Sequence, residues 1–170
     1  MIARRTLLRG AFALAAAGAA ALSAGCAHPQ FLKAGSTEEQ AVAELGAPHA
    51  RTVMPDGTVR LTYSHQPMGQ AVWWVFFDAN GRYLRSEQAL TEENFSLVKP
   101  GMTKKEVYAL FGPCAEVYNF KFLKQTAFMY RFEDGVRRAM AFWVDFDESG
   151  RTVSWTVSDD PWLDKPLRML

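Results

Sequence analysis

Alternation of apolar and polar residues is the clearest pattern along this chain. Val59, Leu61 and Tyr63 alternate with polar neighbours, which is the period of a β-strand with one buried face. Turn signals such as Asn80-Gly81 separate neighbouring segments of this kind. The sequence predicts eight strands, at residues 50–53, 58–65, 71–78, 82–88, 116–122, 126–132, 137–147 and 152–157.

Two short segments instead have apolar residues at helical spacing. In the second of them, Val107 and Phe111 share one face of the predicted helix. Thr103 and Glu106 have the spacing of a capping box, in which each side chain bonds to the other residue's backbone N–H. Gly112 stands where a left-handed residue can end a helix. The segment therefore predicts a short helix with a defined start and end.

The chain contains this helix motif twice. Thr37 lies 66 residues before Thr103, and it is likewise followed by a capping-box residue, a weaker apolar stripe and a glycine. A strand segment repeats as well, because residues 74–82 match residues 143–151, 69 positions further on. Two matching segments in the same order indicate a duplication. Residues 91–98 predict a short helix that links the two copies.

These elements predict an α+β fold made of two tandem repeats. Each repeat is expected to have one or two short helices packed on a mainly four-stranded antiparallel sheet. A unit of about 65 residues buries little of its own surface, so we expect the two repeats to pack against each other.

The N-terminus has the layout of a secretory signal. Arg4, Arg5 and Arg9 precede a run over residues 10–24 that contains no charge. The run is shorter than the ~20 apolar residues that a membrane-spanning helix needs. We therefore predict export from the cytoplasm, by either the general or the twin-arginine route.

The formal net charge of +1 includes those three arginines. Without them, 16 basic residues stand against 18 acidic ones, a net charge of −2. Nucleic-acid binding requires a basic patch, and the composition does not suggest one. No nucleic-acid partner is expected.

The leader ends in Leu22-Ser-Ala-Gly-Cys26, which resembles the lipobox of bacterial lipoproteins. In such proteins the signal is cut before the cysteine, which is then acylated. The resemblance implies lipidation at Cys26, and Ala27 after it implies passage to the outer membrane. The alternative is an ordinary signal peptide with an incidental Cys26.

These patterns divide the chain into five parts. They are a signal peptide, a lipidated tether, a first α+β repeat, a linker helix with the second repeat, and a C-terminal tail, at residues 1–25, 26–33, 34–90, 91–160 and 161–170.

The helix motif also carries a family resemblance. Gly101-Met-Thr-Lys-Lys-Glu-Val107 together with Phe111-Gly-Pro113 resembles the SmpA/OmlA family of outer-membrane lipoproteins, known as BamE-like. The tandem helix-then-sheet arrangement is similar to the wider β-lactamase-inhibitor-protein-like fold. The family resemblance implies an outer-membrane location and an accessory role in β-barrel assembly. The BamE-like member with that role has a single repeat and is smaller than this chain.

Residues that could perform chemistry have plain structural explanations. Cys114 is expected to be a buried small residue after the helix end. Asp145 opens a segment that imitates a calcium loop, but Thr156 stands where the loop needs a bidentate glutamate, so we expect a hairpin turn. Asp159 and Asp160 are expected to be a solvated surface pair. No catalytic residue, metal site or cofactor is expected.

The aromatic residues of the third strand of each repeat point to a binding surface. One face carries alternate apolar residues that we expect beneath the helices: Trp73, Val75, Phe77, Phe142, Val144 and Phe146. The opposite face then carries Trp74, Phe76 and Trp143. A face that meets only water should be polar, so these aromatic side chains imply a contact. Either the linker, the tail with Trp162 or the sheet of the other repeat covers them, or they bind a protein partner.

The sequence therefore predicts a non-enzymatic outer-membrane lipoprotein. Its partners would be the membrane, through its acyl chains, and another envelope protein, in outer-membrane protein assembly or envelope integrity. The alternative is a periplasmic inhibitor that blocks an enzyme through its sheet face. An enzyme, such as a hydrolase, is the third possibility.

Overall fold

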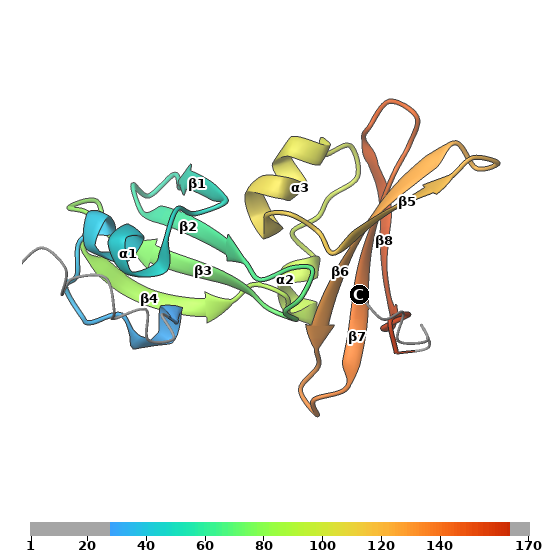
Figure 1. The fold of residues 1–170 in the computed structure, drawn as a ribbon. Coiled ribbons are helices and arrows are strands. Elements are labelled where there is room, and N and C mark those ends of the chain that lie inside the picture. The colour runs from blue at the N-terminus through green and yellow to red at the C-terminus, as the bar shows by residue number, and fades with distance from the viewer. Residues whose placement is uncertain (1–27, 164–170) are drawn as a thin grey trace, which may run out of the picture.

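The computed structural model describes residues 28–163 as two four-stranded antiparallel sheets joined through a helix. Figure 1 shows the two sheets on either side of helix α3. The first sheet has the order β1-β2-β3-β4 and the second the order β5-β6-β7-β8. This architecture confirms the predicted α+β fold of two repeats.

The elements follow the predicted positions closely. The helices are η1 (Pro29–Phe31), α1 (Glu38–Leu45), α2 (Glu92–Phe95) and α3 (Lys104–Phe111). The strands of the first sheet are β1 (Ala50–Val53), β2 (Val59–Ser64), β3 (Val72–Phe77) and β4 (Tyr83–Gln88). Those of the second sheet are β5 (Glu116–Phe120), β6 (Gln125–Glu133), β7 (Ala139–Phe146) and β8 (Thr152–Asp159).

Both main helices begin with the predicted capping box. Thr37 and Gln40 bond reciprocally at the start of α1, as Thr103 and Glu106 do at the start of α3. Each helix ends at a glycine with positive φ. In both repeats a tyrosine hydroxyl from the second strand donates to the carbonyl oxygen of that glycine: Tyr63 to Gly46 at 3.3 Å and Tyr130 to Gly112 at 3.1 Å. The duplication therefore extends to individual hydrogen bonds.

The inner face of each sheet packs as the alternation predicts. In the first repeat, Ala41 of α1 lies over a buried cluster that includes Trp73, Val75 and Phe77. In the second repeat, Val107 and Phe111 of α3 pack with Phe142, Val144 and Phe146, among others. Phe95 of α2 stacks on Phe142, with ring centroids 3.8 Å apart.

The predicted tether at residues 26–33 is partly packed onto the first repeat. Pro29 lies in η1 and is buried, and Leu32 joins the first core cluster. The Ser86 hydroxyl of β4 donates to the carbonyl oxygen of Pro29 at 3.1 Å. From Pro29 onwards this segment is therefore part of the folded repeat.

Candidate functional site

Cys26, the predicted lipidation site, lies outside the described residues together with the predicted signal peptide. Within residues 28–163, no helix is long and apolar enough to cross a membrane.

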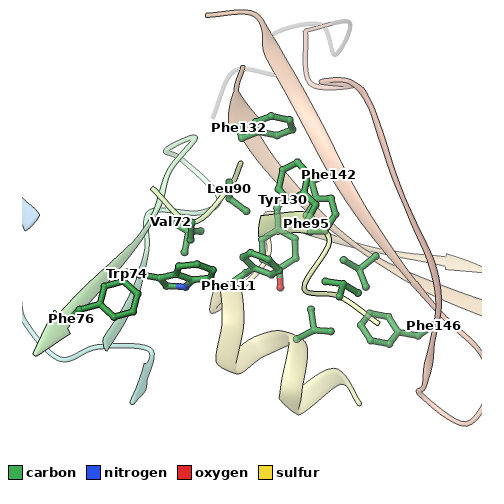
Figure 2. Close-up of a cluster of buried hydrophobic side chains, with 14 residues drawn as sticks. Val72, Trp74, Phe76, Leu90, Phe95, Phe111, Tyr130, Phe132, Phe142 and Phe146 are labelled. Atoms are coloured by element: carbon green, nitrogen blue, oxygen red, sulfur yellow. The ribbon is translucent and has the colours of Figure 1, made fainter. Parts of the chain in front are cut away.

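Trp74 and Phe76 of β3 do not form the open surface that was expected as one possibility. Their exposed fractions are 3% and 6%. Trp74 stacks on Phe111 of α3 with ring centroids 6.1 Å apart, and the two lie in one cluster that spans both repeats (Figure 2). Both residues are therefore covered, as the alternative predicted, but not by the sheet of the other repeat. Helix α3 covers Trp74, and the Arg85 guanidinium of β4 lies 4.1 Å from the ring centroid of Phe76.

The C-terminal end of α3 explains why this face of the first sheet is covered. The last carbonyl groups of a helix have no partner within the helix. The Trp74 indole N–H donates to the carbonyl oxygen of Leu110 at 2.6 Å, and the Thr62 hydroxyl and the Arg60 guanidinium donate to that of Ala109 at 3.2 and 3.3 Å. The outer face of the first sheet therefore supplies the hydrogen-bond donors that α3 needs.

Trp143 of β7 lies on the corresponding outer face of the second sheet, and it is partly exposed. Its indole N–H donates to the Ser158 hydroxyl at 2.9 Å. Its ring meets that of Tyr118 on β5 edge-on, with centroids 5.0 Å apart. The Tyr118 ring in turn stacks with that of Phe120, with centroids 6.4 Å apart. We call Trp143, Tyr118 and Phe120 the aromatic row.

The aromatic row leads to the tip of the β5–β6 hairpin, which projects away from the body of the molecule (Figure 1). Phe120, Phe122 and Leu123 are exposed there by 40%, 104% and 67%. Residues 119–123 line a hollow of about 460 Å³. Apolar side chains exposed side by side at such a tip are typical of a protein-binding surface.

Near the other end of the aromatic row lies a charged pair. The Arg131 guanidinium bonds to the Asp160 carboxylate at 2.7 Å, and the Asp160 side chain is fully buried. The prediction of a solvated pair at Asp159 and Asp160 is therefore wrong for Asp160. The Arg131 guanidinium carbon also lies 4.4 Å from the centroid of the Trp162 ring. The start of the tail therefore packs on this part of the sheet.

The residues that the sequence offered as candidates for chemistry, Cys114 and the loop after Asp145, have structural roles in the fold. Burial raises the pKa of the Cys114 thiol, which makes the reactive thiolate scarcer. In the loop that imitates a calcium site, the Asp147 carboxylate accepts from the Arg151 backbone N–H and the Ser149 hydroxyl, as in a hairpin turn. Within the described part of the chain, no three His, Cys, Asp or Glu residues are grouped to hold a metal.

Sequence reasoning found Trp143 but missed the residues around it. Tyr118 and Phe120 alternate along one strand, and this signal was present in the sequence. Their approach to Trp143 depends on the register that pairs β5, β6 and β7, which alternation alone does not determine.

Comparison with known proteins gives little further information. No family model matches this chain, and no curated protein matches it. Among solved structures, one similar chain is described as a putative osmotically inducible lipoprotein, OsmE. It is 22% identical to this chain, the match covers 39% of this chain and 70% of that one, and the TM-score is 0.34. A likeness at this TM-score supports no inference about this chain.

Proposed function

We propose that this protein is a non-enzymatic lipoprotein, anchored in the outer membrane through an acylated Cys26 and facing the periplasm. It binds another envelope protein and serves outer-membrane protein assembly or envelope integrity. The basic and apolar leader and the lipobox-like ending at Cys26 support the anchor. The resemblance to the BamE-like family supports the role in the envelope.

The observation that carries the binding function is the aromatic row on the second sheet. Interface hot spots are rich in tryptophan and tyrosine and lie in apolar patches. Trp143 and Phe120 present aromatic surface of this kind, continuous with Phe122 and Leu123 at the hairpin tip. A lipid anchor keeps this surface close to other envelope proteins, so a modest affinity gains effective concentration.

Photocrosslinking tests this assignment with a control inside the molecule. A photoreactive residue at Trp143 is expected to label an envelope protein in living cells. The same residue at the buried Trp74 is expected to label no other protein. If position 143 labels no protein, the aromatic row is not the binding surface. Labelling of a single soluble enzyme would identify an inhibitor and overturn the assembly role.

The anchor is tested separately. Wild-type protein is expected in the outer-membrane fraction with an acylated N-terminal peptide by mass spectrometry. Cys26→Ser is expected to lose the acyl chains and to remain uncleaved or leave that membrane. Wild-type protein found free in the periplasm with an unmodified Cys26 would contradict the anchor.

A further inference from the structure

Strand β8 differs from the other three strands at the edges of the two sheets. The edges β1, β4 and β5 each carry charged residues, for example Arg51, Arg85 and Glu116. Charged residues on edge strands discourage pairing with other chains. The one charged residue of β8 is Asp159 at its end, so the seven residues from Thr152 to Ser158 carry no charge and no proline.

The outer edge of β8 is also open over most of its length. Six of its eight residues are exposed. In the described part of the chain, the loop before α3 pairs with the outer edge of β8 only at Thr152. The Thr152 N–H donates to the carbonyl oxygen of Met102, and the Gly101 N–H donates to that of Thr152, both at 2.8 Å. From Val153 onwards, β8 can accept another strand.

A small cavity lies beside the closed end of this edge. It measures about 150 Å³, and it is lined by Val98, Lys99, Pro100, Thr152, Ser154 and Trp155. An apolar cavity of ~150 Å³ is large enough to accept a benzene ring. This cavity therefore has room for one apolar side chain.

Lys99 gives the cavity a positive charge at its rim. The residue is exposed, and it forms no ion pair with any residue between His28 and Leu163. A carboxylate that approached the cavity would meet a cation that no carboxylate between His28 and Leu163 neutralises.

We infer that β8 binds the extended C-terminus of a partner protein by strand addition. The added strand runs antiparallel to β8, so its C-terminus lies beside Thr152. It ends there because the N–H and carbonyl groups of Thr152 are already hydrogen-bonded to Met102 and Gly101. Its last side chain, an apolar one, enters the cavity, and its terminal carboxylate pairs with Lys99. Backbone hydrogen bonds supply affinity, and the cavity and the lysine supply specificity.

This site uses the backbone edge of β8, whereas the aromatic row consists of side chains on the outer face of the sheet, where Trp143 bonds to Ser158. The test of the site does not depend on the lipid anchor. Loss of C-terminal peptide binding would leave crosslinking at position 143 unchanged. Failure of that crosslink would leave peptide binding unchanged.

The test uses an array of eight-residue peptides of mixed sequence, each present with a free C-terminal carboxylate and as its amide. The purified protein, residues 28–170, is expected to select peptides that end in an apolar residue. The amides are expected to bind about tenfold more weakly, as for the loss of one charge-assisted hydrogen bond. Absence of binding, or equal binding of acids and amides, would overturn the inference.

Three variants locate the binding on the structure. Lys99→Glu is expected to abolish the preference for peptides with a free carboxylate. Ser154→Met is designed to fill the cavity, and it is expected to abolish the preference for peptides that end in an apolar residue. Lys105→Glu makes the same charge change on an exposed residue of α3 and is expected to bind as wild type. Thermal unfolding confirms that each variant is folded. If Lys99→Glu and Ser154→Met select the same peptides as the wild type, the peptide binds elsewhere and the inference is overturned.

Discussion

The outer faces of the two sheets differ, although the sheets have the same strand order and each buries alternate residues of its third strand on its inner face. The outer face of the first sheet carries Trp74, which is buried under α3, and Phe76, which is buried beside Trp74 and beneath the Arg85 guanidinium. The outer face of the second sheet carries Trp143, which remains partly exposed. The difference arises because α3 of the second repeat packs on the outer face of the first sheet, where it contacts Trp74 and Thr62.

The two main helices show the same contrast. Both have eight residues, a capping box and a terminal glycine. Helix α1 covers one sheet and buries only Ala41, whereas α3 lies between two sheets and buries Val107 and Phe111. Duplication thus repeats local structure faithfully, but position in the chain decides which surfaces are buried. The outer face of the second sheet, where Trp143 is partly exposed, is the one that we propose for a partner.

The largest expected effect comes from truncating corresponding positions of the two helices. Phe111 is fully buried against rings of both sheets, so Phe111→Ala is expected to lower the free energy of unfolding by about 3–5 kcal/mol. Leu45 is only partly buried, so Leu45→Ala should cost roughly 1–2 kcal/mol. Urea denaturation measures both values. Equal losses would mean that α3 does not join the two repeats.

The next effect concerns the buried ion pair near one end of the aromatic row. Asp160→Ala leaves the Arg131 guanidinium, whose side chain is only 15% exposed, without its partner. A loss of about 3 kcal/mol is expected. The control is Glu148→Ala, which breaks the exposed pair with Lys124 at the open end of the same sheet. That change should cost less than about 0.5 kcal/mol. Similar losses from the two variants would show that the Asp160 carboxylate is hydrated.

A smaller effect distinguishes the two tryptophans directly. Trp74→Phe removes the N–H that donates to the carbonyl oxygen of Leu110 at 2.6 Å and leaves that oxygen only the 3.5 Å bond from the Thr62 hydroxyl, which should cost about 1–2 kcal/mol. Trp143→Phe removes only an exposed bond to Ser158 and should cost less than about 0.5 kcal/mol. Thermal unfolding of both variants measures the difference. In binding assays the order should reverse, with Trp143→Phe having the larger effect on the partner. A larger loss of stability from Trp143→Phe would contradict the assignment of covered and open faces.

The sequence predicted what local periodicity and capping determine, and missed what depends on long-range packing. Alternation located the strands and their inner faces, and the threonine-led motifs located both helices. The burial of Trp74 required the carbonyl end of α3 to meet a sheet about forty residues earlier in the chain, which no local pattern encodes. Asp160 was misassigned for the same reason, because its partner Arg131 lies two strands away.

The smallest effect tests the one chemical difference between the two capping boxes. In each box a side-chain oxygen accepts a hydrogen bond from the backbone N–H of the threonine. This oxygen belongs to the Glu106 carboxylate in α3 and to the Gln40 amide in α1. Hydrogen bonds from the Thr103 backbone and hydroxyl lower the pKa of Glu106. A carboxyl group whose folded pKa is lowered stabilises the fold above its unfolded pKa, about 4.3, and loses that contribution as the pH falls through the folded value. Glu106→Gln is therefore expected to reduce the loss of stability on acidification below pH 5.

The comparison is made by urea denaturation of wild type and Glu106→Gln at pH 7 and at pH 3.5, with NMR titration of the Glu106 carboxylate. Exchanging Gln40 for Glu should give α1 the same pH dependence, because the geometry of the two boxes is the same. If Gln40→Glu does not increase the loss of stability between pH 7 and pH 3.5, the two boxes have the same geometry but different electrostatic surroundings. The charge near Glu106 would then decide the difference, since Arg151 also lowers the pKa of Glu106. In the first turn of α1, hydrogen bonds from the Glu39 backbone and the Thr37 side chain lower the pKa of Glu39, and Arg82, which matches Arg151, lowers it further. We therefore expect the two boxes to respond alike.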